Sequence, residues 1–313
     1  MIRIGTRASV LATTQSRWVG ERLHQKLGRE FELVEITTDG DRSQAAGTSL
    51  ADASGTGVFV NALRDALLDD RIDVAVHSLK DLPTYPHEGI VLAALPPRED
   101  PRDVVVARDG LTLGELPVGS KVGTGSPRRA AQLHALGLGL EVDGIRGNVD
   151  TRIGKVHSGE YDAVILARAG LARIGRLDEA TEVLDPLQML PAPGQGALAV
   201  ECLAEGDLGE VLREALDDRY TRAAVEAERA VLATLEGGCS APIGVLAEVV
   251  EGEDEEEIWV RAVALSLDGV LSVRMSASGA PTDAVGVGTR LANEMLADGA
   301  AGLTVTADKR QNA

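Results

Sequence analysis

The chain has 313 residues, which is more than one hydrophobic core usually fills, so two or three domains are expected. Its formal net charge of -18 excludes a broadly basic surface for nucleic acid, and no apolar run in the sequence is long enough to span a membrane. Aromatic residues make up only 2% of the chain, so Val, Leu, Ile and Ala must build the cores.

Apolar runs alternate with helical patterns through the first two hundred residues, which is typical of parallel sheets with helices on both faces. Between the strands, residues 58–68 repeat apolar side chains at intervals of three and four, which predicts an amphipathic helix. The predicted strands are residues 3–5, 32–36, 73–77, 91–95, 103–106, 121–123, 140–142 and 163–166.

Two proline clusters, residues 95–101 and 190–196, interrupt this alternation and are interpreted as connections between domains. They enclose about ninety residues, which indicates a domain inserted into another. We therefore expect domain 1 at residues 1–97 and 195–217, domain 2 at 98–194, and domain 3 at 218–313. The fold class predicted is α/β, with two doubly wound domains like those of periplasmic binding proteins and a small α+β C-terminal domain.

The end of the chain has a different pattern. Residues 258–263 and 271–275 alternate apolar and polar side chains, which predicts a small antiparallel sheet covered by a helix at 288–296. By contrast, residues 38–57 are polar, rich in glycine and without periodicity. Their length favours a lid over a plain surface loop.

Three strands run into a small polar residue at a helix start, with arginine alongside: residues 5–9, 123–129 and 145–152. Ser9, Ser126 and Asn148 are suitable N-caps, and helix N-termini with adjacent arginines suit carboxylates. A single arginine is most simply a solvated surface residue, but seven concordant basic positions in so acidic a chain predict a pocket for a polyanion. They are Arg7, Lys80, Arg128, Arg129, Arg146, Arg152 and Arg173.

Two further segments carry chemistry. Asp81 lies directly after Lys80 at the end of an apolar strand. A carboxylate in this position can stabilise a cationic intermediate. The alternative is that Asp81 is an ordinary turn cap. Cys239 follows two glycines in a turn and can anchor a covalent group, whereas Cys202 lies in an apolar run and is expected in a core. His77 is expected to be a packed residue, and the histidines show no metal-ligand spacing, so no metal is expected.

The N-terminal sequence and the charged residues give expectations for the cellular location and the surface of the protein. The N-terminal residues enter a strand at once without a targeting pattern, so a cytoplasmic location is expected, and a monomer is the default. Lysine is rare, and the acidic, arginine-containing surface predicts a salt-rich cytosol. An acidic protein from an ordinary or high-GC bacterium is the alternative.

Several segments together resemble the porphobilinogen deaminase (hydroxymethylbilane synthase) family. They occur in order over roughly the first 245 residues, and they are residues 2–9, 75–81, 98–103, 146–149, 194–197, 226–230 and 237–239. The resemblance implies a transferase of haem biosynthesis that joins four porphobilinogen molecules head to tail into hydroxymethylbilane, releasing ammonia. It also implies a dipyrromethane primer held by a thioether to Cys239.

The resemblance further implies roles for individual residues. Asp81 would be catalytic, stabilising the cationic azafulvene and assisting departure of ammonia. Lys80, Thr124, Ser126, Arg128, Arg129 and Arg146 would join Cys239 in binding the cofactor, and Arg7, Ser9, Arg152 and Arg173 would bind the substrate and the growing polypyrrole chain. Residues 39–57 would shield the site from water. Thr56, Asn61, Gly125 and Pro127 depart from the family's commoner residues.

Two other readings stay open. Two α/β lobes joined by two crossings also describe an anion-binding receptor or effector domain without catalysis, which would need no Cys239. A nucleotide-dependent transferase is more distant, because residues 123–126 lack the full glycine spacing and the phosphate-loop lysine. Product formation from porphobilinogen without ATP would eliminate it.

Overall fold

The computed structural model describes residues 1–36, 55–235, 241–252 and 255–303. The chain divides into two compact units: unit 1 comprises residues 1–98 and 197–222, and unit 2 comprises residues 99–196 and 223–313. No helix among the described residues is long and apolar enough to cross a membrane.

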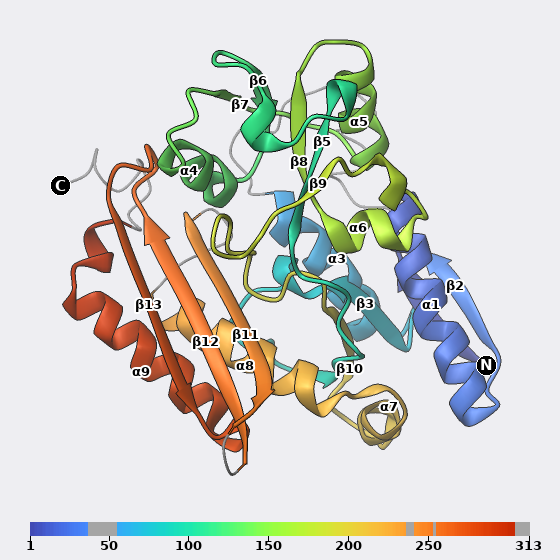
Figure 1. Ribbon diagram of the computed structural model, residues 1–313. Coiled ribbons are helices and arrows are strands. Elements are labelled where there is room, and N and C mark those ends of the chain that lie inside the picture. Colours follow the sequence, from blue (N-terminus) through green and yellow to red (C-terminus); the bar gives the residue numbers. More distant parts are fainter. Residues whose placement is uncertain (37–54, 236–240, 253–254, 304–313) are drawn as a thin grey trace, which may run out of the picture. The chain divides into compact units, whose positions relative to one another are not determined.

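Unit 1 is built on a five-stranded sheet of order β2-β1-β3-β10-β4. Figure 1 labels β2, β3 and β10 of this sheet. The strands are β1 (Ile2–Thr6), β2 (Phe31–Glu35), β3 (Val74–Ser78), β4 (Ile90–Ala94) and β10 (Leu198–Leu203). Strand β1 pairs in parallel with β2 and β3, whereas β10 is antiparallel to both β3 and β4. The expectation of parallel strands is therefore confirmed for β1, β2 and β3 and is wrong for β10, through which the chain returns from the inserted segment.

The helices of unit 1 include α1 (Val10–Leu27), α3 (Gly55–Leu68) and α7 (Leu208–Leu216). Ser9 caps α1 by accepting a hydrogen bond from the Ala12 amide at 3.4 Å, as its sequence position predicts. Cys202 lies in the core of this unit and is fully buried, so the expectation that it is a core residue is confirmed. Helix α3 begins at Gly55, so the last residues of the predicted lid are helical.

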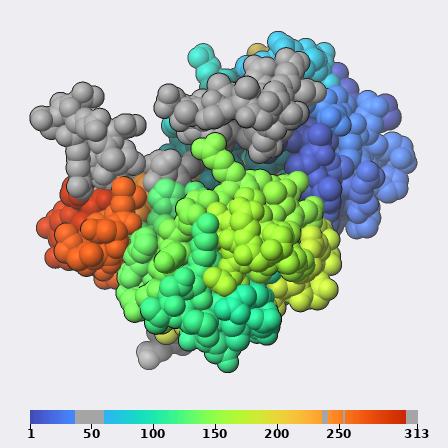
Figure 2. All heavy atoms as spheres, turned by 90° about the horizontal axis from the view of Figure 1, so that it is seen from above, coloured from blue at the N-terminus to red at the C-terminus, as the bar shows by residue number. Residues whose placement is uncertain are grey.

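Unit 2 contains a second five-stranded sheet, of order β7-β6-β8-β5-β9. Its strands are β5 (Asp103–Ala107), β6 (Lys121–Gly123), β7 (Glu141–Asp143), β8 (Ala163–Ala167) and β9 (Glu182–Val183), and its helices are α4 (Pro127–Ala135), α5 (Val149–His157) and α6 (Arg168–Arg173). This sheet is also mixed, since β5 runs antiparallel to β8 and β9. In Figure 2 the segment that carries it, green to yellow, forms one continuous body.

Both faces of this sheet are buried. Val105 and Ala107 belong to one apolar cluster with Leu133 of α4, while Val104 and Val106 belong to another with Ile153 of α5. Side chains alternate between the faces of a strand, so the continuous apolar run of β5 is what two helical layers require.

Unit 2 also holds a three-stranded antiparallel sheet formed by β11 (Ile243–Glu251), β12 (Glu256–Leu265) and β13 (Ser272–Gly279). Helices α8 (Arg219–Thr234), which begins in unit 1, and α9 (Ala284–Ala297) contribute to its core. The predicted sheet and helix are confirmed, although β11 was not predicted. Short 3-10 helices complete the fold: η1 (Leu79–Asp81), η2 (Arg108–Gly110), η3 (Leu113–Glu115), η4 (Leu177–Glu179), η5 (Pro281–Asp283) and η6 (Ala300–Gly302).

The fold class expected from the sequence, two α/β sheets and a small α+β part, is confirmed, with the correction that both larger sheets are mixed. The three domain boundaries stay a prediction.

Candidate active site

A pocket of about 160 Å³ in unit 1 contains Asp81. Strand β3 ends at Ser78, and the 3-10 turn η1 that follows it carries Lys80 and Asp81. The pocket is lined by the segment after β1, by α1, by α3, and by β3 with the turn that follows it. The lining residues are Arg7, Ala12, Gln15, Val60, Leu63, Val76, His77, Ser78 and Asp81. The pocket therefore combines an apolar wall with one carboxylate and a few polar groups, as small-molecule sites do.

The electrostatic environment of Asp81 has two opposing parts. Desolvation by the surrounding protein raises the pKa of its carboxyl above the ordinary value, while the charges of Lys80, Arg7 and His77 act in the opposite direction. The net direction is upward. A carboxylate that is desolvated and faced by cations is typical of sites where charge develops during a reaction.

The polar side of the pocket is fixed by α1 and β3. Gln15 Nε2 donates to Ser78 Oγ at 3.1 Å, which joins the helix to the end of the strand. Ser9, at the N-cap of α1, is partly buried and belongs to the same turn as Arg7. Of the residues assigned to this part of the site from the sequence, the structure places Arg7 and Asp81 in one pocket. Gln15 was missed, because nothing local distinguishes it from other helical glutamines.

A second group of assigned residues lies in unit 2, where α4 begins. Thr124 is buried, and its Oγ1 accepts a hydrogen bond from the Ser126 amide at 3.2 Å. Ser126 Oγ in turn accepts from the Arg129 amide at 3.5 Å, and Pro127 takes the first helical position. This cap sets the direction of the two arginine side chains that follow.

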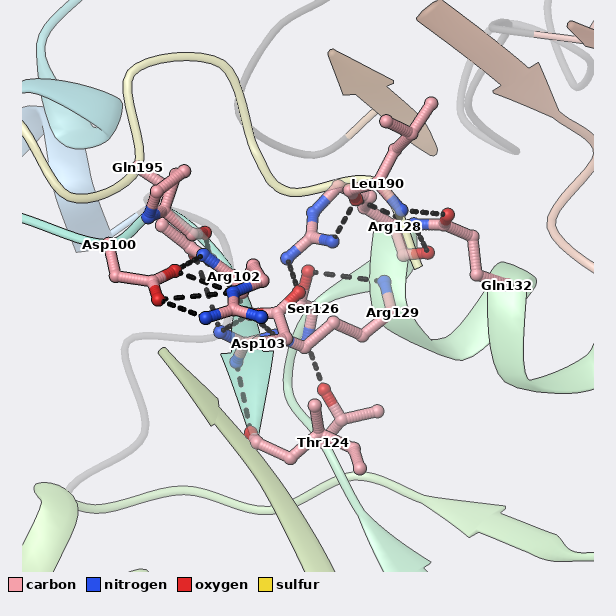
Figure 3. Close-up of polar contacts among 12 residues, drawn as sticks. Asp100, Arg102, Asp103, Thr124, Ser126, Arg128, Arg129, Gln132, Leu190 and Gln195 are labelled. Atoms are coloured by element: carbon pink, nitrogen blue, oxygen red, sulfur yellow. Dashed lines mark hydrogen bonds and ion pairs between the residues drawn. The ribbon is translucent and has the colours of Figure 1, made fainter. Parts of the chain in front are cut away.

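Arg128 and Arg129 converge on one carboxylate, that of Asp103 at the start of β5 (Figure 3). Arg128 NH2 lies 2.8 Å from Asp103 Oδ2, and Arg129 donates to Oδ1 through Nε at 3.1 Å and NH2 at 2.8 Å. Gln195 Nε2 donates to the same Oδ1 at 2.8 Å. Burial alone would raise the pKa of the Asp103 carboxyl, but these cations and hydrogen bonds hold it well below its usual range.

Backbone carbonyls hold the outer nitrogens of the two arginines. Arg129 NH1 donates to the carbonyl of Ile165 at 3.0 Å, and Arg128 NH1 donates to that of Leu190 at 2.5 Å. Both side chains are almost fully buried. The positions of these two guanidinium groups are therefore fixed by several contacts each.

Two more arginines are half-buried in unit 2. Arg152 Nε donates to the carbonyl of Gly147 at 2.8 Å, and the pKa of its guanidinium is lowered by desolvation and by the charge of Arg129. Arg173 NH2 donates to the carbonyl of Gly196 at 2.6 Å. We call Arg128, Arg129, Arg152 and Arg173 the arginine cluster. Arg146 is exposed.

Among the residues that the structure describes, the arginine cluster carries an excess of positive charge. Asp103 is shared by two of its members, and Glu99, which acts on Arg173, already pairs with Arg168 at 3.2 Å. Desolvated guanidinium groups in excess over carboxylates are stabilised by an added anion. This arrangement can therefore bind a ligand that carries several carboxylates.

Cys239 and residues 37–54 of the predicted lid lie outside the described residues. Asp103 and Gln195 were not assigned from the sequence. Asp103 could have been found from its position as the first residue of the otherwise apolar strand β5, because a charged side chain buried there requires a partner of opposite charge. Among the described residues, no group of three or more His, Cys, Asp or Glu side chains is placed to hold a metal ion.

Comparison with known proteins assigns the chain to a protein family. A family model described as "Porphobilinogen deaminase, dipyromethane cofactor binding domain" matches residues 2–208, and one described as "Porphobilinogen deaminase, C-terminal domain" matches residues 222–297. The chain belongs to the porphobilinogen deaminase family.

Curated relatives are similar over nearly their whole length. A porphobilinogen deaminase from Mycobacteroides abscessus is 57% identical over 309 residues, covering 97% of this chain and 99% of the relative. One from Mycobacterium tuberculosis is 58% identical over 306 residues, covering 96% and 97%. The chain is thus a transferase of tetrapyrrole biosynthesis whose substrate is porphobilinogen and whose cofactor is dipyrromethane.

Solved structures of periplasmic binding proteins are similar to a smaller part of the chain and with much lower sequence identity. An ABC transporter periplasmic substrate-binding protein from Coxiella burnetii aligns with 68% of this chain and 90% of its own, at 13% identity and a TM-score of 0.42. The methionine-binding protein MetQ aligns with 68% and 89%, at 11% identity and a TM-score of 0.43. The sheet orders given above define the fold independently of these two structures.

The described residues of this chain fit a dipyrromethane group chemically. Such a group presents carboxylates, which require cations, and pyrrole N–H donors, which require an acceptor. Taken separately, unit 2 has an excess of guanidinium groups in its arginine cluster, and unit 1 has a pocket with a carboxylate that the surrounding protein desolvates.

Proposed function

We propose that Asp81 is the catalytic carboxylate of this porphobilinogen deaminase. The observation that supports it is its place in the unit 1 pocket, where Arg7 lines the same space and desolvation raises its pKa. Its carboxylate would accept hydrogen bonds from pyrrole N–H groups and stabilise the positive charge that develops on the substrate when its aminomethyl nitrogen leaves as ammonia. Four such condensations would give hydroxymethylbilane.

We further propose that the cofactor is linked through a thioether to Cys239. When bound, the dipyrromethane supplies the pyrrole carbon onto which the first substrate unit is added. Lys80, Thr124, Ser126, Arg128, Arg129 and Arg146 would hold the cofactor carboxylates, and Arg7, Ser9, Arg152 and Arg173 would hold the substrate and the growing chain. The excess positive charge of the arginine cluster supports the binding of carboxylates in unit 2, where the Ser126 cap presents amide groups at the start of α4. In unit 1, the Ser9 cap presents amide groups at the start of α1, two residues after Arg7.

Intact-mass spectrometry tests the attachment. The purified wild-type enzyme is expected to exceed its sequence mass by two pyrrole units, and Cys239→Ala is expected to show the bare sequence mass and no turnover. Cys202→Ala is the matched control, because Cys202 is a buried core thiol on β10. Loss of the adduct in Cys202→Ala, or its retention in Cys239→Ala, would contradict the assignment.

We also propose the three domains given above, a monomer and a cytoplasmic location. The formal net charge of -18 supports a monomer, because copies of the chain repel one another in dilute salt. The free thiol of Cys202 suits a reducing compartment. Light scattering after size exclusion tests the monomer, and a mass twice that of the chain would contradict it.

A further inference from the structure

One glutamine side chain of α4 holds both backbone polar groups of Leu190 in unit 2 (Figure 3). Gln132 Oε1 accepts from the Leu190 amide at 2.8 Å, and Gln132 Nε2 donates to the Leu190 carbonyl at 3.0 Å. The same Nε2 lies 3.4 Å from the carbonyl of Arg128, one helical turn earlier, which fixes the direction of the side-chain amide. Gln132 is 2% exposed and Leu190 is 1% exposed. Gln132 therefore binds the Leu190 backbone out of reach of water.

The Leu190 carbonyl also accepts from an arginine of the cluster. Arg128 NH1 donates to it at 2.5 Å, and Arg128 NH2 lies 2.8 Å from Asp103 Oδ2. Among the described residues, Arg128 Nε is buried and has no hydrogen-bond partner. Arg129, by contrast, donates to Asp103 through two nitrogens and to the Ile165 carbonyl through a third. The direction of the Arg128 guanidinium therefore depends on the Leu190 carbonyl, whereas that of Arg129 is fixed without it.

The other side of the Leu190 segment lies against β11. The Val245 amide of this strand donates to the Pro191 carbonyl at 2.9 Å. A Cβ at Gly244 would lie 2.8 Å from both the Cβ and the carbonyl oxygen of Leu190, so the strand passes directly beside it. In the sequence, β11 is the first strand after Cys239. Leu190 thus joins an arginine of α4 to the strand that follows the proposed attachment residue.

We propose that Gln132 is a positioning residue for the cofactor, because its hold on Leu190 keeps the Arg128 guanidinium in one direction beside β11. This inference rests on the proposed role of Arg128 in binding a cofactor carboxylate and extends it. A guanidinium binds a carboxylate best when its planar fork is held in place, and Arg128 Nε has no acceptor among the described residues. An apolar side chain at position 132 would leave the Leu190 amide unpaired and its carbonyl free to turn.

The rate of cofactor uptake by Gln132→Met tests the proposal. Methionine has nearly the same length as glutamine but cannot make either hydrogen bond to Leu190. Full-length chain without cofactor, produced in cells that make no porphobilinogen, is mixed with porphobilinogen, and intact-mass spectrometry follows the gain of two pyrrole units. Uptake is expected to be slower than in the wild type by about tenfold, as for the loss of one hydrogen bond to a charged group. Uptake at the wild-type rate would overturn the proposal.

Glu182→Met is the matched control for a purely structural effect. Glu182 of β9 also lies in unit 2, and its Oε2 accepts from the amide of the buried residue Leu113 at 2.6 Å. This variant therefore also leaves a backbone amide of the interior without its partner, but it does not touch the arginine cluster. Its free energy of unfolding should fall, while uptake stays at the wild-type rate. Equally slow uptake in Glu182→Met and Gln132→Met would attribute the effect to lost stability and overturn the proposal.

A double variant shows whether Gln132 acts through Arg128. In the Arg128→Lys background the guanidinium fork is absent, so Gln132→Met should slow uptake further by less than about twofold. A further loss as large as in the wild-type background would show that Gln132 acts by another route and would overturn the proposal.

The Arg128 side chain can also be observed directly, without any measurement of uptake. In protein with ¹⁵N-labelled arginine, the guanidinium signals of Arg128 are identified by their loss in Arg128→Lys. We expect resolved NH1 and NH2 signals in the wild type and merged signals in Gln132→Met, with those of Arg129 resolved in both. Unchanged Arg128 signals in Gln132→Met would overturn the proposal. Merged signals together with wild-type uptake would support the positioning of Arg128 by Gln132 and contradict instead the proposed role of Arg128 in cofactor binding.

Discussion

Arg129 meets Asp103 through two nitrogens, Nε at 3.1 Å and NH2 at 2.8 Å, and Asp103 is completely buried. The same carboxylate accepts Arg128, so one acidic residue compensates two buried guanidinium groups. Asp103 therefore contributes to the stability of unit 2 and holds Arg128 and Arg129 of the arginine cluster in place.

The first prediction concerns Asp103→Asn, which keeps the shape of the side chain and removes its charge. Two buried cations then lack their anion, so the free energy of unfolding should fall by about 3 to 5 kcal/mol in urea titrations at pH 7. Asp109→Asn is the control, because Asp109 pairs with Arg108 at 2.9 Å on the surface. Its free energy of unfolding should change by less than about 1 kcal/mol. Equal losses of unfolding free energy in the two variants would contradict the inference that Asp103 compensates two buried guanidinium groups.

The second prediction concerns acid stability in unit 1. Burial raises the pKa of the Glu201 carboxyl, but hydrogen bonds from His77 and Arg64 lower it to about 2 in the folded state, below its ordinary value of 4.5. Its contribution to stability is therefore complete above about pH 4.5 and is lost as the pH falls toward 2. The contribution is on the order of 3 kcal/mol.

Urea titrations between pH 6 and pH 3 check this. The loss of unfolding free energy over that range should be clearly smaller in Glu201→Gln than in the wild type. Glu210→Gln, at an exposed position of α7, should keep the wild-type slope. A wild-type slope in Glu201→Gln would show that other carboxylates dominate acid unfolding.

A third prediction uses two glycines with similar backbone conformations. Gly196 has φ +87°, and a Cβ there would lie 2.3 Å from the carbonyl oxygen of Glu99. Gly206 has φ +82° with nothing within 4 Å of such a Cβ. Alanine at Gly206 should cost about 1 to 2 kcal/mol of unfolding free energy for the left-handed backbone alone, and alanine at Gly196 about 2 to 5 kcal/mol, because the backbone of Glu99 must also move.

The Gly196→Ala variant should also bind substrate less well. The carbonyl of Gly196 accepts from Arg173 NH2 and from the Glu99 amide, so a shift of this segment displaces Arg173. KM for porphobilinogen should rise in Gly196→Ala and stay unchanged in Gly206→Ala. Equal stability and equal KM in the two variants would contradict the close approach at Gly196.

Much of the fold could be predicted because its elements are encoded locally. The apolar runs of β5 and β8 and the three-to-four periodicity of α3 all gave elements of the correct type. Strand direction could not be predicted, since an apolar run buried on both faces looks the same in either direction. Residues 198–203 were not predicted as a strand, and only Cys202 among them was assigned to a core. They form β10, the strand that makes the unit 1 sheet mixed.

The candidate site was predictable where chemistry sits at the end of a strand or the start of a helix. Arg7 and Asp81 were assigned from such positions, and both line the unit 1 pocket, although their roles stay predictions. Asp103 and Glu201 were not assigned, because their importance comes from partners 25 to 137 residues away. Local sequence patterns do not contain such pairings.

The acidic surface gives a fourth prediction, which concerns salt. If it is an adaptation to a salt-rich cytosol, screening of the net charge of -18 should raise the free energy of unfolding between dilute and molar potassium chloride. Thermal unfolding at several salt concentrations checks this, with sodium and potassium compared to exclude a specific ion. If the midpoint temperature of unfolding stays constant or falls as the salt concentration rises, the hypothesis of a salt-rich cytosol is contradicted, and the chain is an ordinary acidic protein.

The last prediction concerns Asp81 itself. Asp81→Ala should fold, because Asp81 is partly exposed in a short 3-10 turn, and it should lose at least a hundredfold in kcat, as expected when a catalytic acid–base group is removed. Asp81→Glu keeps the carboxylate on a longer side chain and should retain some activity. Turnover is measured as product formed from porphobilinogen, after mass spectrometry has shown that each variant carries the cofactor.

Asp109→Ala is the control for Asp81→Ala, since Asp109 is an exposed aspartate of the 3-10 turn η2 in unit 2 and touches neither the pocket nor the arginine cluster. It should turn over at the wild-type rate. Near-normal turnover in Asp81→Ala would remove the catalytic role from this carboxylate. Retention of activity in Asp81→Glu but not in Asp81→Asn would instead show that the negative charge, and not the shape of the side chain, is what the reaction requires.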